Sequence, residues 1–341
     1  MHNGTYRDDI PPNYGMYECI KLGLKDGIKF YISKGANDWN YGMYHAAKYS
    51  TKNLIGFFIK LGANNWNMGL AWSVWGKRKN NIEFFIKKGA CDWNNALSAA
   101  AKNGDNDMII FFISKGANDW NLGMLSAAEG NHKQWVEFFI GLGANNFNGG
   151  LYYAAYRNNK DLIDFFIQRG ARSWNAGLEG AAEGGHKSLI DFFIDKGADD
   201  LNCGLCGAVR GQNVELINIF INLGAKDWNC GMCAATHFCN MNLVEYFISL
   251  GANDWAGGLE YAKIGGHKDA IDFFIRKMFH FVDYNMPGTC PICYNTSQTN
   301  LVMTTCNHVF HQECIISWLE RQNTCPVCRK NLSLEKSEKK E

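Results

Sequence analysis

The sequence predicts a mainly α-helical protein, in which a solenoid of short repeated units is followed by one small, separate domain. Two observations predict this organisation. A glycine recurs every 27 residues from Gly35 to Gly251, and a strict period of this length is typical of stacked helical repeats. The last quarter of the chain then contains closely spaced cysteines and histidines, a composition typical of small domains that fold around metal ions.

Ten copies of the repeated unit fit into residues 14–283, after a polar segment at residues 1–13. The unit reads Gly-Leu-x-x-Ala-Ala-x-x-Gly-His-Lys-x-Leu-Ile-x-Phe-Phe-Ile-x-x-Gly-Ala-x-x-Trp-Asn. Its Leu-x-x-Ala-Ala stretch predicts a first helix whose small residues admit a close neighbour. The Leu-Ile-x-Phe-Phe-Ile stretch predicts a second helix that is buried on most sides. We expect Gly197 and its equivalents to end that helix in the left-handed conformation, and Asn175 and its equivalents to cap the next helix.

The Ala-Ala-x-x-Gly-His and Gly-Ala-x-x-x-Asn stretches of the unit resemble the ankyrin repeat. The unit is six residues shorter than the 33 residues of that family, and the loss falls where ankyrin repeats form a β-hairpin. We therefore expect helix pairs with little or no strand. Shortened arrays of this composition are similar to those encoded by giant DNA viruses.

The resemblance implies that the array binds a protein through variable positions on the first helix of each unit. These candidate substrate-binding residues are Tyr44, His45, Trp72, Tyr152, Tyr153, Glu179, Glu260 and Tyr261. The recurring Trp, as in Trp93 and Trp120, could instead be imagined as a ligand-binding ladder. Because its position in the unit does not vary, we interpret it as a packing residue.

After a linker at residues 284–289, residues 290–330 contain eight side chains that can bind a metal ion, and a charged tail follows at residues 331–341. The eight are Cys290, Cys293, Cys306, His308, His311, Cys314, Cys325 and Cys328. Eight ligands suffice for two closed tetrahedral sites. Closed sites are structural, since a catalytic zinc keeps one position open, so we expect two zinc ions that stabilise the fold.

At these residues the chain resembles the RING finger family in its two-histidine form. PHD fingers and LIM domains fit the order and spacing of the ligands less well. The resemblance implies interleaved ligand sets. Cys290, Cys293, His311 and Cys314 would bind zinc one. Cys306, His308, Cys325 and Cys328 would bind zinc two.

RING domains of this kind act as ubiquitin-protein ligases, and the resemblance implies the same activity here. The positions that contact the ubiquitin-conjugating enzyme in the family are occupied by Ile292, Trp318 and Pro326, and Arg329 stands at the position that bridges that enzyme to its bound ubiquitin. The RING would supply no nucleophile and would act by positioning the thioester. The alternative function is a non-enzymatic scaffold or competitor, in which the zinc domain is a structural cap.

Two Cys-x-x-Cys pairs one repeat apart, Cys203/Cys206 and Cys230/Cys233, leave a third metal site as an open alternative. Neighbouring helices are separated by about 8–10 Å, which disfavours a metal site shared by the two pairs.

The chain carries 34 basic and 33 acidic residues, so nucleic-acid binding has little electrostatic support. No apolar run is long enough for a membrane span. We expect an intracellular, cytoplasmic or nuclear protein.

Overall fold

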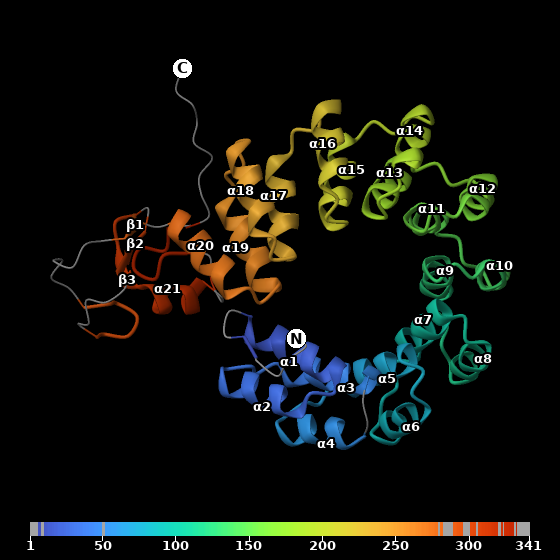
Figure 1. Ribbon diagram of the computed structural model, residues 1–341, viewed down its shortest axis with the longest axis horizontal. Coiled ribbons are helices and arrows are strands. Elements are labelled where there is room, and N and C mark those ends of the chain that lie inside the picture. Colours follow the sequence, from blue (N-terminus) through green and yellow to red (C-terminus); the bar gives the residue numbers. More distant parts are fainter. Residues whose placement is uncertain are drawn as a thin grey trace. The chain divides into compact units, whose positions relative to one another are not determined.

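The computed structural model describes residues 6–7, 10–49, 52–278, 280–281, 289–295, 301–304, 306–319, 322, 324–330 and 332. Within these residues the chain forms 21 helices and three short strands (Figure 1), so the prediction of a mainly helical fold is confirmed. None of the helices described is long and apolar enough to cross a lipid bilayer. The chain divides into two compact units, Met1–Leu216 and Ile217–Glu341.

The first unit consists of helix pairs arranged in two rows (Figure 1), as the repeat predicts. The first row contains α1 (Pro12–Leu22), α3 (Trp39–Tyr49), α5 (Trp66–Trp75), α7 (Trp93–Asn103), α9 (Trp120–Glu129), α11 (Phe147–Tyr156), α13 (Trp174–Glu183) and α15 (Leu201–Arg210). The second row contains α2 (Lys25–Ser33), α4 (Lys52–Lys60), α6 (Lys79–Lys87), α8 (Asn106–Ser114), α10 (Lys133–Gly141), α12 (Lys160–Gln168) and α14 (Lys187–Asp195). Helix α16 (Val214–Leu223) crosses the boundary between the units.

The second unit continues with helix pairs and ends in the metal-ligand segment. Its helices are α17 (Trp228–His237), α18 (Met241–Ser249), α19 (Trp255–Ile264) and α20 (Lys268–Met278), followed by α21 (Gln312–Leu319). Its strands are β1 (His280–Phe281), β2 (Leu301–Met303) and β3 (Val309–His311). Among the described residues from 12 to 278 every regular element is a helix, as the shortened repeat predicts. Of the predicted linker 284–289, only Thr289 lies within the described residues.

The two helices of a unit interlock through a glycine and a phenylalanine. A Cβ atom built on Gly42 of α3 would lie 2.6 Å from the ring of Phe58 in α4. Phe58 has no exposed surface, and the same glycine–phenylalanine pair recurs in other repeats, for example at Gly123 and Phe139. Only a residue without a side chain lets the ring pack this closely against the first helix. The small residues of the unit therefore set the distance between its helices.

The turn after the second helix follows the predicted chemistry in one respect and departs from it in another. Gly197 and its equivalents have φ values near +100°, including 106° at Gly197 itself, which is the left-handed conformation that glycine adopts most easily. The recurring Asn does not cap the helix, so that expectation was wrong. In other repeats the residue before the Trp does this, as where Asp92 accepts from the N–H of Asn95 at 3.1 Å, whereas Ser173 before Trp174 forms no such bond.

The recurring Asn instead joins consecutive repeats. The Oδ1 atom of Asn40 accepts hydrogen bonds from the backbone N–H groups of Asn64 and Asn65, at 2.9 and 3.1 Å. The same pair of bonds recurs from Asn67, Asn94, Asn121, Asn148 and Asn175, and from Asn229 in the second unit. Each of these amides satisfies two backbone donors that the next turn leaves unpaired.

The recurring Trp packs within its own helix pair. Trp93 and Trp120 are half-buried, and their rings stack on Phe112 and Phe139 with centroids 6.3 and 6.4 Å apart. One face of each ring is therefore occupied by packing inside the helix pair. These contacts support the packing role over the ligand-binding ladder.

Candidate metal centre

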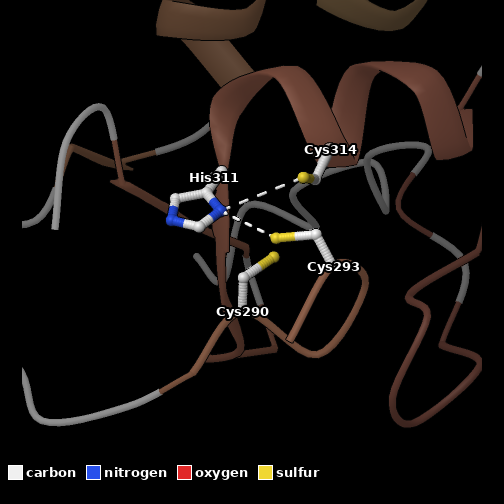
Figure 2. A group of neighbouring side chains, drawn as sticks. All are labelled: Cys290, Cys293, His311 and Cys314. Carbon is white, nitrogen blue, oxygen red and sulfur yellow. Dashed lines mark hydrogen bonds between the residues drawn. The ribbon is translucent and has the colours of Figure 1, made fainter. Parts of the chain in front are cut away.

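The structure gathers the eight predicted ligands into two sets of four. Cys290, Cys293, His311 and Cys314 form the first set, and their ligand atoms all lie within 4.8 Å of one another. Figure 2 shows the three sulfur atoms and the Nδ1 atom of His311 pointing toward one common position. The Nδ1 atom of His311 is 3.2 Å from Cys293 Sγ and 3.9 Å from Cys314 Sγ.

Cys306, His308, Cys325 and Cys328 form the second set, with the same 4.8 Å limit. The Nδ1 atom of His308 is 3.4 Å from Cys306 Sγ and 3.6 Å from Cys325 Sγ. In tetrahedral zinc sites the metal lies about 2.3 Å from sulfur and about 2.1 Å from nitrogen, which places sulfur and nitrogen about 3.5 Å apart. Both sets therefore have the dimensions of a closed tetrahedral site.

Each Cys-x-x-Cys pair is held by the same backbone turn. In the first, the N–H of Tyr294 donates to the carbonyl of Cys290 at 2.8 Å, and in the second the N–H of Arg329 donates to the carbonyl of Cys325 at 2.9 Å. Tyr294 and Arg329 have φ values of 56° and 59°. A left-handed residue after the second cysteine turns the chain back, which brings both sulfurs to one side.

The remaining ligands are placed by a small sheet and one helix. Strands β2 and β3 pair in antiparallel fashion, with Val302 opposite Phe310. Both side chains are fully buried, as is Ile315 of α21. This core fixes His311 at the end of β3 and Cys314 in the first turn of α21. With so few apolar residues, a domain of this size needs a further source of stability.

The cysteines of the two sets differ in their pKa values. Burial raises the pKa of Cys306, but hydrogen bonds with His308 and Thr304 outweigh it and hold the pKa at about 6. Burial and the neighbouring cysteines together raise the pKa of Cys314 to about 12 and that of Cys325 to about 11. Crowded thiolates repel one another, so full deprotonation of either set requires a bound cation. Thiolate and imidazole together are ligands that zinc accepts readily in tetrahedral geometry.

A cavity of about 390 Å³ lies beside the first set. It is lined by Ile292, Glu313, Cys314, Ser317, Trp318 and Gln322. Two of the residues predicted to contact the conjugating enzyme, Ile292 and Trp318, thus share one surface depression. The indole N–H of Trp318 donates to the carbonyl of Thr324 at 2.8 Å, which fixes the orientation of the ring.

The other two predicted contact residues, Pro326 and Arg329, lie on the second Cys-x-x-Cys turn and are not among the lining residues of this cavity. Arg329 is exposed.

Sequence reasoning did not select Glu313, Ser317 or Gln322, which also line the cavity. Glu313 and Ser317 are four residues apart in α21, and the i, i+4 spacing from Glu313 to Ser317 could have indicated a shared face with Cys314 and Trp318.

The candidate substrate-binding residues lie on first helices of their pairs, as predicted: Tyr44 and His45 on α3, Trp72 on α5, Tyr152 and Tyr153 on α11, Glu179 on α13, and Glu260 and Tyr261 on α19. Their exposure differs. Glu260 and Tyr261 are exposed, whereas Tyr44 is buried and therefore belongs to the packing of α3. Tyr152 donates to Glu183 at 2.6 Å, and Glu183 also accepts from Arg210 at 2.7 Å.

The two Cys-x-x-Cys pairs of the repeats, Cys203/Cys206 and Cys230/Cys233, are absent from the metal-ligand clusters that the described residues form. Burial and the negative charge of Asp200 together raise the pKa of Cys203 to about 12. Its thiol lies 2.9 Å from the Asp200 carbonyl, to which it donates. Burial likewise raises the pKa of Cys233 to about 12. Both thiols are therefore protonated at neutral pH.

Comparison with known proteins finds relatives for the zinc-ligand segment. A family model described as a Ring finger domain matches residues 288–329. E3 ubiquitin-protein ligase RNF126 of Xenopus tropicalis is 52% identical over 46 residues, which are 13% of this chain and 15% of that protein. E3 ubiquitin-protein ligase RNF115 of Homo sapiens is 46% identical over 50 residues, covering 14% of this chain and 16% of its own length.

RING-H2 finger protein ATL30 of Arabidopsis thaliana is 71% identical over 31 residues, which are 9% of this chain and 11% of that protein. The chain thus carries a C-terminal RING finger that is homologous to those of E3 ubiquitin ligases. The match spans less than a fifth of the length of these relatives, and it does not extend into the helical array.

Proposed function

We propose that this protein is a RING-type ubiquitin-protein ligase whose helical array binds a protein substrate. One observation carries the proposal: the cavity lined by Ile292 and Trp318 lies directly against a closed four-ligand set. The relatives that share this segment are named as ubiquitin ligases. The partner would be a ubiquitin-conjugating enzyme carrying ubiquitin as a thioester.

In this proposal each ligand set holds one structural zinc ion, which contributes to folding and takes no part in the transfer. The two sets fix the Cys-x-x-Cys turns, and these turns place Ile292, Pro326 and Arg329 on the surface. Ile292 and Trp318 offer an apolar contact to the conjugating enzyme. The guanidinium of Arg329 is a planar donor that can bond two carbonyl oxygens at once, so it would hold the enzyme and ubiquitin in one orientation.

The chemical step in this mechanism is the attack of a substrate lysine on the thioester carbonyl of the conjugating enzyme. A new amide bond forms, and the thiol of that enzyme leaves. The RING accelerates the step by holding the reactants in the productive geometry. The array, which we propose to be a shortened ankyrin-like solenoid, would bring the substrate within reach of the thioester. We place this activity in the cytoplasm or the nucleus.

The test is autoubiquitination of the full-length protein with a broad panel of conjugating enzymes. We expect chains with at least one enzyme of the panel, none with Cys290→Ala, and a strong reduction with Arg329→Ala. Lys330→Ala is the matched control, since it removes a neighbouring exposed cation, and it should retain activity. If no enzyme of the panel yields chains, the protein is the non-enzymatic scaffold, and substitutions on the array face alone should impair its function.

A further inference from the structure

A second cavity, of about 590 Å³, lies in the first unit between the N-terminal ends of α4 and α6. It is lined by Lys52, Asn53, Lys77, Arg78, Lys79, Asn80 and Asn81. Four of these residues are cationic and the other three are asparagines, so the lining contains no carboxylate. In the part of the chain that the structure describes, Lys52, Lys77 and Lys79 form no ion pair. The cavity thus concentrates positive charge that the protein does not neutralise.

Arg78 occupies a position that histidine takes in other repeats. The Nε2 atom of His186 lies 2.9 Å from the carbonyl of Tyr156, thirty residues earlier. The Nε–H of Arg78 donates to the carbonyl of Lys48, also thirty residues earlier, at 3.1 Å. Arg78 therefore performs the same structural task as His186. Unlike a neutral imidazole, it adds a permanent charge beside the cavity.

Lys77 adds a second charge at a position that favours glycine. Its φ is 55°, and the equivalent positions hold Gly104 and Gly185 in other repeats. A left-handed lysine costs about 1 kcal/mol relative to glycine. Both departures from the repeat pattern, at Lys77 and Arg78, thus increase the positive charge at one turn.

The surrounding repeats share this charge. Residues 10–104 contain thirteen lysines and arginines against five aspartates and glutamates, although the whole chain is nearly neutral. Like charges that lie close together repel one another and oppose folding. A partner that supplies negative charge would remove this repulsion, which is the basis of electrostatic complementarity at interfaces.

An exposed aromatic residue precedes the cationic turn of the cavity in the chain. Trp75 ends α5, two residues before Lys77 in the chain, and is 38% exposed, although it is not among the residues that line the cavity. The ammonium of Lys48 lies 3.0 Å from the centroid of its ring. Tryptophan and arginine are the residues that most often carry binding energy at protein interfaces. The segment that carries the cations of the cavity thus also carries an exposed aromatic ring.

We propose that this cavity binds a carboxylate-rich segment of the protein that the array captures. The role of that protein as a ubiquitination substrate rests on the proposed function, whereas the binding itself does not. A polypeptide fits better than a nucleic acid for two reasons. Tight nucleic-acid binding uses about 6–10 phosphate contacts along a track, but the cavity offers four cations. In addition, the cavity is lined by no aromatic residue, so it offers no ring on which a base could stack.

The experiment measures binding of a fluorescein-labelled oligoglutamate peptide to the full-length protein by fluorescence anisotropy, without a conjugating enzyme. We expect saturable binding that weakens with added salt. The charge-reversal variant Lys77→Glu/Lys79→Glu should weaken it by about tenfold or more. Lys87→Glu/Lys88→Glu is the matched control, because it reverses two charges at the other end of α6, away from the cavity. It should change the affinity by less than about threefold.

Lys52→Glu, from the neighbouring repeat, provides a second variant in case the first does not fold, and it should also weaken binding. Equal loss of affinity in the control variant would overturn the proposal, as would unchanged affinity in both cavity variants. Tighter binding of a single-stranded oligonucleotide, in competition with the peptide, would show a nucleic-acid site instead. Autoubiquitination is measured on the same preparations. Chain formation without peptide binding refutes only this inference, whereas binding without chains refutes only the ligase.

Discussion

The side-chain amide of Gln312 donates a hydrogen bond of 3.1 Å to a carboxylate oxygen of Asp272. Gln312 begins α21 of the RING finger, and Asp272 lies in α20, the last helix of the array. Strand β1 adds a second connection, because His280 pairs with Met303 of β2. Within the second unit, the last helix pair and the RING finger are therefore joined by side-chain and backbone bonds, and not only by the linker.

Removal of this hydrogen bond should loosen α21. A hydrogen bond to a charged group contributes about 1.5 kcal/mol, so Asp272→Leu should speed amide exchange in residues 312–319 by about tenfold. Asp272→Asn keeps an acceptor for Gln312 and should cause a smaller change. Hydrogen–deuterium exchange with mass spectrometry measures both. Equal exchange in the wild-type protein and both variants would mean that the bond does not stabilise α21.

The periodic part of the fold could be predicted from the sequence because each copy repeats the same evidence. The glycine at the end of each pair, the small residues of the first helix and the purely helical structure of the described residues from 12 to 278 all follow from local rules. The eight metal ligands could be found for a similar reason, since Cys-x-x-Cys spacing places two sulfurs together through a single turn.

Contacts between repeats could not be predicted in the same way. The sequence places Asn40 near the start of a helix. There its side chain can either cap that helix or accept from a backbone N–H of the next repeat. Which of the two bonds forms depends on the distance to Asn64, which only the packed structure sets. The cation-lined cavity was missed for the same reason, because Lys52 and Lys77 come together only when two repeats stack.

Removal of metal should unfold the RING finger and leave the array intact. Cys290→Ala and Cys306→Ala each take one ligand from a different set, so each variant should lose about one of two bound zinc ions. Far-ultraviolet circular dichroism should change little, because most helices lie between residues 12 and 278. Elemental analysis beside circular dichroism tests this. Retention of both zinc ions in either variant would contradict the ligand assignment.

Substitution of Trp318 should weaken binding of the conjugating enzyme while the RING finger stays folded. Trp318→Ala removes the apolar wall of the cavity near Ile292 and should weaken binding of the conjugating enzyme by about tenfold or more. Trp318→Phe keeps a ring but loses the hydrogen bond to Thr324, and it should retain more affinity. Isothermal titration calorimetry compares the variants, with zinc content as the folding control. Wild-type affinity in Trp318→Ala would exclude this cavity as the docking site.

The stability of the first unit should depend on the pH through His45. Burial, together with the charges of Lys48 and Lys21 and against that of Asp38, lowers the pKa of His45 to about 4. In the unfolded chain the pKa is about 6.5, so below this pH the unfolded state binds a proton that the folded state excludes. The free energy of unfolding therefore has its full value above pH 6.5. It decreases as the pH falls from 6.5 toward 4, because the unfolded state is then stabilised by protonation.

Between pH 7 and pH 4.5 the wild-type protein should lose about 2 kcal/mol more than His45→Phe, after allowance for the partial exposure of the ring. Phenylalanine keeps a ring at the position where His45 stacks on Tyr17, at a centroid distance of 4.9 Å. Urea unfolding at the two pH values gives the difference. Identical losses in both proteins would show that His45 does not govern the response.

Two glycine-to-alanine substitutions in one helix pair should have opposite effects on stability. In Gly42→Ala the new methyl group would lie 2.6 Å from the ring of Phe58, which has no free space to move because it is fully buried. We expect a loss of about 1–3 kcal/mol from overpacking, which exceeds the gain in helix propensity. In Gly56→Ala the methyl group would meet no atom within 4 Å, so the gain of about 1 kcal/mol remains. Urea unfolding measures the stability of both variants. Equal stability of Gly42→Ala and Gly56→Ala would show that close packing of glycine on phenylalanine does not set the distance between the helices of the repeat.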